Sequence, residues 1–345
     1  MKHTNHEHIH AMATPERTYP ETEVQIPINE KLTLAGSLVD PSATTATTPP
    51  VMVLFLAGSG PIDRDENVGW MQRLNVFNTL SQRLAADGIA SFRYDKRGTG
   101  KSLGVKLDAA GLYDLLNDIV AVVDYFGQES YADGRYANSK LILVGHSEGT
   151  ILAAMTSLKR PDRVDSLVLV CPFCTPLDEV LVQQAKAVEK KIEEAPGCGG
   201  MLQRTIVNCF GLHPVKVQAG LIQKIKASSD VTIRFMLQPI PALWFREHFA
   251  LDAADVYRKV SVPTSVVVGS FDTQCDPQDG PKIVDLVPSN NAKLRVVDRL
   301  THLLRKEETN TGFTGYGKQM KEPLDEELQA VVSRWCTDRA ASNGA

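Results

Sequence analysis

The sequence contains no apolar run that approaches the roughly 20 residues needed by a transmembrane helix. It also lacks the charged and then apolar N-terminal stretch that directs secretion. Neither sign of charge dominates, since 37 basic and 41 acidic residues leave a net charge of −4, which gives no reason to expect nucleic acid as a partner. We therefore expect a cytoplasmic protein with no membrane span and no nucleic-acid partner.

Cysteine is present but shows little pattern. Only Cys171 and Cys174 have the Cys-x-x-Cys spacing of a redox dithiol, and they follow an apolar stretch at 166–170 instead of opening a thioredoxin-like unit. No second pair has zinc-ligand spacing, and a large chain without a secretion signal is not a typical disulfide scaffold. We expect no cofactor and no metal, with a dithiol redox protein as an alternative.

The first residues differ from the rest. Four of the eight histidines lie at positions 3, 6, 8 and 10, a pattern typical of an expression tag, and Met12 is a candidate natural start. Residues 1–12 therefore do not enter the fold prediction.

The remainder has an ordinary soluble composition, with 43% hydrophobic and 23% charged residues over the whole chain. A chain of this length can bury about three quarters of its unfolded surface.

Apolar strand-like runs alternate with amphipathic segments along the chain. This order predicts an α/β fold, a mostly parallel twisted sheet with helices on both faces. Two antiparallel strands are expected at 24–39. Further strands are expected at 51–56, 89–94, 141–144, 166–170, 263–269 and 292–297, and helices at 68–87, 109–126, 150–158, 278–286 and 325–335. Residues 175–249 break the alternation, so we expect a core of 13–174 and 250–340 with a helical cap inserted at 175–249.

The most informative stretch joins a strand to a helix. Leu141–Val144 is an apolar run that leads directly into Gly145-His146-Ser147-Glu148-Gly149. This Gly-x-Ser-x-Gly pattern is typical of a nucleophile elbow, where a strained serine presents its hydroxyl at the end of a sheet. The two glycines avoid Cβ collisions at the corner. The alternative is an ordinary strand-to-helix turn with an inert serine.

A serine hydroxyl becomes nucleophilic when a base removes its proton and an acid orients the base. In such sites the chain order is Ser, then Asp or Glu, then His. Among the downstream histidines, only His302 follows a late strand, and it is the predicted base. We expect packing or surface roles for His213 and His248.

The predicted acid is Asp272, which lies just after the strand at 263–269. Asp276 competes with it, although a helix cap or a turn before Pro277 suits that position better. Asp298 is a weaker candidate.

Backbone N–H groups should stabilise the oxyanion. One is expected from Glu148, the residue after the nucleophile, and the other from the glycine-rich loop after the strand at 51–56. Ser59 is the first candidate there, with Gly58 or Gly60 as alternatives. A turn without any donor role is the other interpretation.

These motifs together resemble the serine α/β-hydrolase superfamily. The match is closest to an esterase-like group that has a Gly-His-Ser-Glu-Gly elbow and a Gly-Ser-Gly-Pro-x-Asp-Arg-Asp oxyanion loop, here residues 58–65. Residues 93–102 match the turn that such hydrolases have after the fourth strand. Ala57 departs from the pattern, because relatives usually have His there. The resemblance also favours a structural clamp formed by ion pairs of residues 63–66.

The resemblance implies a carboxylic ester hydrolase acting on a small or medium apolar substrate through an acyl-enzyme on Ser147. An acyltransferase or a lactone hydrolase with the same triad is the alternative, and a non-catalytic ligand-binding homologue is a further one. A peptidase is less favoured, and a dehalogenase is excluded because it needs a carboxylate in place of Ser147.

Overall fold

The computed structural model describes residues 18–42, 51–69, 73–197, 199, 201, 205, 207–208, 212–288 and 291–342, so the predicted tag at 1–12 lies outside the described part. The strands are β1 Thr22–Asn29, β2 Leu32–Val39, β3 Val51–Leu56, β4 Ala90–Tyr94, β5 Lys140–His146, β6 Val164–Val170, β7 Ile233–Phe235, β8 Gln238–Ile240, β9 Thr264–Gly269 and β10 Ala292–Val297. The helices are α1 Val76–Ala86, α2 Leu112–Phe126, α3 Glu148–Lys159, α4 Leu177–Glu194, α6 Pro214–Ala227, α7 Ala242–Ala250, α8 Ala253–Lys259, α9 Asp279–Leu286, α10 Tyr316–Gln319 and α11 Glu326–Ala341.

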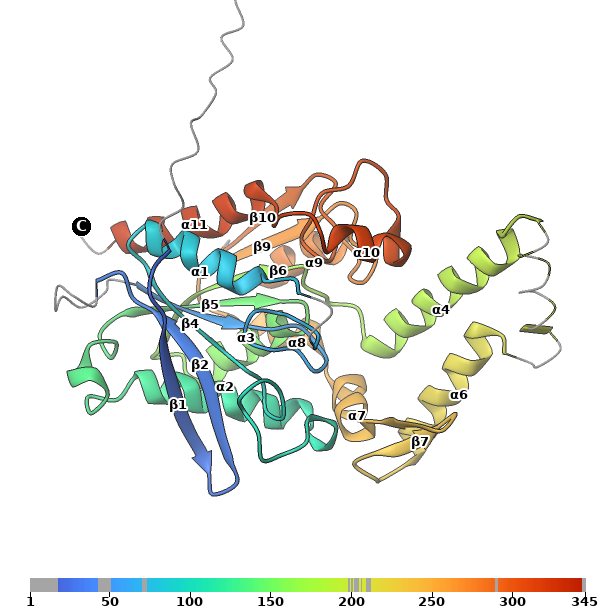
Figure 1. Cartoon of the computed structure of the whole chain (residues 1–345), viewed down its shortest axis with the longest axis horizontal. Helices are drawn as coiled ribbons and strands as arrows, with labels where there is room; N and C mark the ends of the chain where they lie inside the picture. The colour runs from blue at the N-terminus through green and yellow to red at the C-terminus, as the bar shows by residue number, and fades with distance from the viewer. Residues whose placement is uncertain are drawn as a thin grey trace, which may run out of the picture.

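Eight strands form one sheet in the order β1-β2-β4-β3-β5-β6-β9-β10 (Figure 1). The pairs β1–β2 and β2–β4 are antiparallel, and all other pairs are parallel. The predicted mostly parallel sheet is therefore confirmed. Because parallel strands end at the same edge, the loops after β3, β4, β5, β6, β9 and β10 all meet there.

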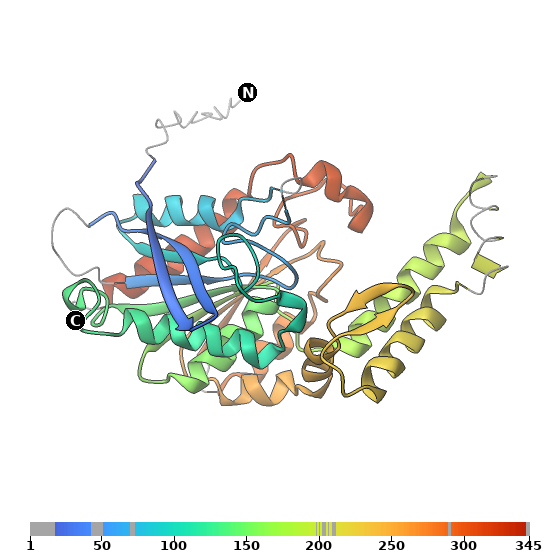
Figure 2. The ribbon, with the colours of Figure 1, turned by 60° about the horizontal axis from the view of Figure 1, so that its bottom comes forward.

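Helices cover both faces of this sheet (Figure 2). On one face α1 and α11 pack over an apolar cluster that includes the stacked rings of Phe55 and Phe77. On the other face α2, α3 and α8 pack over a second cluster centred on the apolar residues of β4, β5 and β6. The central strands β3, β5 and β6 are buried on both sides, which explains why their sequences are nearly continuous apolar runs.

The segment between β6 and α8 lies beyond the sheet edge. Both views show α4 and α6 extending away from the sheet, whereas α7 returns to it and packs against α2 (Figures 1 and 2). The sequence predicted helices here but not the β7–β8 hairpin. The hairpin turns at Met236 and Leu237, which both have positive φ, 46° and 67°. Such positions favour Asn or Gly, so these residues gave no turn signal.

One helix begins later than predicted. The expected helix at 68–87 starts at Val76, after Asn75 adopts a left-handed conformation with φ 51°. Residues 70–72 of the predicted range lie outside the described residues. Before them, Asp63 accepts the backbone N–H groups of Asp65 and Asn67, and the Asn67 side chain accepts the Asn75 N–H. Polar side chains that bond to nearby backbone compete with helix formation, which explains the delayed start.

The helices found in the described ranges do not include a membrane span. The longest of them, α4, has 18 residues and none has the required apolar content.

Candidate active site

The predicted elbow has the geometry of a sharp strand-to-helix corner. β5 ends at His146, α3 begins at Glu148, and Ser147 between them has φ 52° and ψ −118°. A Cβ atom at Gly145 would lie 2.2 Å from the Gly149 carbonyl oxygen, and one at Gly149 would lie 2.0 Å from the Leu56 carbonyl oxygen. Both glycines are therefore required by close backbone contacts, which hold Ser147 in a strained conformation at the sheet edge.

The structure brings Asp272 and His302 together. The His302 Nδ1 atom lies 2.9 Å from Asp272 Oδ2 and 3.1 Å from Oδ1, and both residues are buried. Asp272 also accepts the backbone N–H groups of Gln274 and Cys275. Burial alone would raise the pKa of Asp272, but His302 and these hydrogen bonds lower it, so the carboxylate stays ionised.

The competing carboxylates have other partners. Asp276 accepts the backbone N–H of Gln278, at the start of α9, and Asp298 accepts the Ser270 hydroxyl. His248 Nε2 bonds to Glu148 and His213 lies beside Glu189, so both imidazoles have other carboxylate partners. His248 thus has a polar partner in the Ser147 cavity instead of the packing or surface role expected for it.

Ser147 lies close to this pair without bonding to it. Between the described side chains, no hydrogen bond joins the Ser147 hydroxyl to His302, and catalytic hydrogen bonds often tighten only when substrate binds. The Cys275 sulfur lies within 4.8 Å of ligand atoms of both Asp272 and His302, and Cys275 lines the same cavity as Ser147.

The loop after β3 packs directly against the elbow. A Cβ atom at Gly58 would lie 3.3 Å from the Ser147 Cβ. The Gly58 N–H donates to Glu66 Oε1 at 3.0 Å, which removes Gly58 from the candidate oxyanion donors. In the described part of the chain the N–H groups of Ser59, Gly60 and Glu148 donate to no protein acceptor. These three remain available to a ligand.

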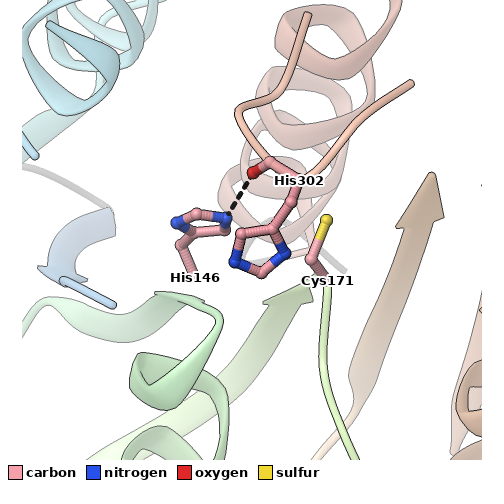
Figure 3. Close-up of side chains that lie close together, drawn as sticks. All are labelled: His146, Cys171 and His302. Atoms are coloured by element: carbon pink, nitrogen blue, oxygen red, sulfur yellow. Dashed lines mark hydrogen bonds between the residues drawn. The ribbon is translucent and has the colours of Figure 1, made fainter. Parts of the chain in front are cut away.

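His146 bridges the oxyanion loop and the loop that carries His302. Its Nδ1 lies 2.9 Å from Glu66 Oε2, and its Nε2 donates to the His302 carbonyl oxygen at 3.1 Å (Figure 3). Burial opposes the charged imidazole, but the Glu66 carboxylate raises the pKa of His146 overall, and the pKa of Glu66 is lowered. A carbonyl oxygen faces one ring nitrogen and a carboxylate faces the other, so both imidazole nitrogens can donate, and both pKa directions favour an imidazolium paired with a carboxylate.

Figure 3 also shows Cys171 beside His302. The ligand atoms of His146, Cys171 and His302 lie within 4.8 Å of one another, which is a geometry that a metal ion can use. However, both nitrogens of His146 are protonated donors, and burial raises the pKa of the Cys171 thiol well above its ordinary value. Metal binding requires deprotonated ligands, so this donor set does not suit a resident metal.

Glu148 has a second role that the sequence did not indicate. Its buried carboxylate pairs with Lys96 Nζ at 3.0 Å and accepts hydrogen bonds from Trp244 Nε1 and His248 Nε2, at 2.6 and 3.0 Å. Burial alone would raise its pKa, but Lys96 and His248 lower it to about 2. The carboxylate is therefore ionised at neutral pH, and Lys96, Trp244 and His248 all contact it.

A cavity of about 240 Å³ opens over Ser147. Ser59, Ser147 and Glu148 contribute to its wall. Most of the remaining wall is apolar and comes from the loop after β6, from α4 and from α7, namely Phe173, Leu177, Val180, Leu181, Trp244 and Phe245. The other lining residues are Gln184, His248, Gln274 and Cys275. A larger hollow of about 790 Å³ between α4 and α6 shares no lining residue with this cavity. Ser147 thus lines the smaller cavity and not the larger one.

A family model described as serine aminopeptidase, S33 matches residues 69–309, well over half of the chain. The chain belongs to this family. As an S33 family member it is a serine α/β-hydrolase, which confirms the resemblance and the fold class expected from the motifs.

Curated relatives of this S33 family member include enzymes that act on esters. Esterase EstD of Thermotoga maritima is 24% identical over 287 residues, which cover 82% of this chain and 61% of the esterase. Human monoglyceride lipase is 23% identical over 240 residues, which cover 67% of this chain and 72% of the lipase. The chain thus spans about three fifths of the length of the Thermotoga esterase.

Solved structures show the same fold. Est1E of Butyrivibrio proteoclasticus with bound ferulic acid has a TM-score of 0.58 at 15% identity, with 92% of this chain and 99% of that chain covered. Proline iminopeptidase of Mycobacterium smegmatis has a TM-score of 0.55 at 16% identity, with 93% of this chain and 100% of that chain covered.

The cysteines of this S33 family member give little support to the dithiol alternative. Cys171 is buried, Cys174 is half-buried, and both are free thiols. Burial raises the pKa of each thiol. Reactive dithiols need a lowered pKa, so these two are poorly suited to exchange.

The ion-pair clamp next to the oxyanion loop of this family member is confirmed. Arg64 pairs with Asp95 and Glu23, and Arg93 pairs with Asp65. These contacts tie the segment after the oxyanion loop to β1, β4 and the loop after β4.

Sequence reasoning placed Glu66 in an ion-pair clamp without its partner, and it missed the other side chains that connect these loops, namely Lys96, His146, Trp244 and His248. Their one common signal is position, since Glu66, Lys96 and His146 lie at the ends of parallel strands or in the loops that follow them.

Proposed function

We propose that this chain is a serine carboxylic ester hydrolase that forms an acyl-enzyme on Ser147. The observation that carries the proposal is the strained Ser147 at the strand–helix corner, which opens into an apolar cavity beside the paired Asp272 and His302. Similarity to an esterase and to a monoglyceride lipase supports the same activity.

In the first half-reaction His302 Nε2 takes the Ser147 proton while Oγ attacks the ester carbonyl carbon. Asp272 accepts the His302 Nδ1–H and stabilises the imidazolium that forms. The carbonyl oxygen becomes an oxyanion that receives N–H donors from Glu148 and Ser59. When the carbonyl re-forms, the alcohol leaves with the proton from His302. Water then repeats the sequence on the acyl-enzyme and releases the acid.

The cavity favours a small or medium apolar acyl or aryl group. Its volume of about 240 Å³ is below the roughly 300–1,000 Å³ of ordinary ligand pockets, and aromatic and aliphatic side chains form most of its wall.

The family description raises aminopeptidase activity as a competing assignment. An aminopeptidase must bind the positively charged amino terminus of its substrate, which favours a free carboxylate at the site. Of the described residues lining the Ser147 cavity, Glu148 is the one carboxylate, and Lys96, Trp244 and His248 already occupy it. This supports an uncharged ester as the substrate.

The test is the Ser147→Ala variant with p-nitrophenyl butyrate as substrate. We expect kcat to fall by roughly 10⁴-fold or more with the fold intact, since a triad acts as a unit. An organophosphate should label Ser147, and peptide mapping of the label identifies the nucleophile. Retained activity in the variant, or a label on another residue, would overturn the assignment. Aminoacyl p-nitroanilides, assayed in parallel, should be poor substrates.

A further inference from the structure

Lys96 contacts both halves of the proposed oxyanion hole. It lies two residues after the end of β4 and is only 5% exposed. Its ammonium donates to the Gly58 carbonyl oxygen and pairs with Glu148 at 3.0 Å. One buried cation therefore joins the loop after β3 to the first residue of α3.

The contact with Gly58 controls the direction of the Ser59 N–H. The Gly58 carbonyl and the Ser59 N–H belong to one peptide unit, and in a trans peptide they point in opposite directions. A cation fixed on the carbonyl therefore directs the N–H away from Lys96. Ser59 lines the Ser147 cavity, and its N–H has no acceptor among the described residues.

The neighbouring peptide unit is fixed as well. The Gly58 N–H donates to Glu66, a second buried charged group. Glycine has unusual backbone freedom, so the Gly58–Ser59 peptide would otherwise rotate easily. Lys96 and Glu66 together remove that freedom, and a cation on the carbonyl also polarises the peptide and strengthens its N–H as a donor.

We propose that Lys96 is a positioning residue for the oxyanion hole, which holds the Gly58–Ser59 peptide and the start of α3 in the orientation that stabilises the tetrahedral intermediate. This inference rests on the proposed function. Through Glu148 the same contacts reach Trp244 and His248 of α7, so the wall of the substrate cavity is joined to the oxyanion donors.

The central variant is Lys96→Met, which keeps the length of the side chain and removes the cation. We expect kcat for p-nitrophenyl butyrate to fall by roughly 10- to 100-fold, which is less than or comparable to the loss of one oxyanion donor. KM should change by less than about threefold, because the interaction strengthens only in the transition state. Lys101→Met is the matched control, since Lys101 is exposed and pairs with Glu23, and it should keep wild-type kcat.

A second readout isolates the oxyanion. An alkyl trifluoromethyl ketone forms a bond from its carbonyl carbon to Ser147 Oγ, the serine proton passes to His302, and the ketone oxygen becomes the oxyanion. Its inhibition constant should rise in Lys96→Met by about the factor lost in kcat/KM, as expected for a transition-state analogue. Binding of butyrate, the product acid, serves as the ground-state reference and should change much less.

Removing Lys96 also leaves Glu148 as an unpaired buried charge, which can destabilise the protein. The double variant Lys96→Met/Glu148→Gln removes both charges and keeps an acceptor for Trp244 and His248. It also keeps the test available if the single variant does not fold. The proposal requires that the double variant keep a kcat for the ester, and an affinity for the ketone, below those of wild type.

Wild-type levels of kcat and ketone affinity in the folded double variant would overturn the role of Lys96. Failure of the proposed function has a different signature, because wild type and Ser147→Ala would then hydrolyse the ester equally.

Discussion

At the scale of single residues, the proposed acid is distinguished from its neighbours by its partners. Asp272 accepts two backbone N–H groups and the His302 imidazole, so its carboxylate is oriented and ionised. Asp276, four residues later, contacts the start of α9 and not the imidazole. Two carboxylates in one loop thus have different environments. Substituting each of them in turn can distinguish their contributions to catalysis.

We predict that Asp272→Asn lowers kcat by roughly 10³- to 10⁴-fold, because an amide at this position favours the wrong imidazole tautomer. Asp276→Asn retains a side-chain oxygen that can accept the Gln278 N–H, and it should keep near wild-type kcat. Steady-state kinetics with p-nitrophenyl butyrate measure both variants, and far-UV circular dichroism checks their folding. Equal losses in the two variants would contradict the assignment of the acid.

The predicted positions of Ser147, Asp272 and His302 follow from strand ends and chain order, which a sequence records directly. The partners of Lys96 and Glu66 cannot be read from strand ends or chain order. Their partners, Glu148 and His146, lie 52 and 80 positions away. A charged residue in a loop is usually solvated, so nothing local indicates that these two are buried and paired.

At the scale of secondary-structure elements, the sequence predicted best where burial is continuous. β3 begins and ends at the predicted residues, because a strand covered on both faces is an unbroken apolar run. β10 also keeps its predicted bounds, although residues 293–296 of this edge strand are exposed. Elements that depend on turn chemistry were predicted less well. Leu237 at the tip of the β7–β8 hairpin is 89% exposed and in a left-handed conformation, which no propensity rule anticipates.

The elbow makes a prediction about glycine at this scale. In Gly149→Ala the new methyl group would meet the Leu56 carbonyl oxygen, 2.0 Å away, at the junction of β3 and α3. We expect the free energy of unfolding to fall by more than about 3 kcal/mol, since neither backbone segment can move without disturbing the sheet.

Gly220→Ala is the matched control for this variant. Gly220 lies within α6, and no atom lies within 4 Å of the position that its Cβ would occupy. Alanine there should raise the free energy of unfolding by about 0.5–1 kcal/mol, because it favours the helix. Urea unfolding of both variants measures the contrast, and a similar loss in both would show that the close contact at Gly149 does not control stability.

At the scale of the whole molecule, three segments distant in sequence meet through one buried ion pair. Glu66 lies after the oxyanion loop, His146 ends β5, and the His302 carbonyl lies in the loop after β10. The loops at the sheet edge are therefore joined by side chains as well as by the strands beneath them. We therefore expect the loss of this contact to lower the free energy of unfolding of the entire fold, and not only the rate of catalysis.

The pKa of His146 is raised above its ordinary 6.5 in the folded state, and the pKa of Glu66 is lowered below its ordinary 4.5. The stabilisation from His146 is therefore fully present below pH 6.5 and is lost as the pH rises through its raised folded value. The stabilisation from Glu66 is present above pH 4.5 and is lost as the pH falls through its lowered folded value. The pair should therefore stabilise the fold most between pH 4.5 and pH 6.5, where both contributions are fully present.

The comparison that tests this is wild type against the double variant His146→Gln/Glu66→Gln, whose amides can keep hydrogen bonds but cannot titrate. The neighbouring titratable groups, Asp272 and His302, are present in both proteins. Their contributions to the pH dependence of stability therefore largely cancel in the comparison. Urea unfolding should give the largest advantage of wild type near pH 6 and a smaller one at pH 9. An advantage that stays constant or grows towards pH 9 would mean that the imidazole is neutral in the folded protein. The bridge between the three loops would then be an ordinary hydrogen bond and not an ion pair.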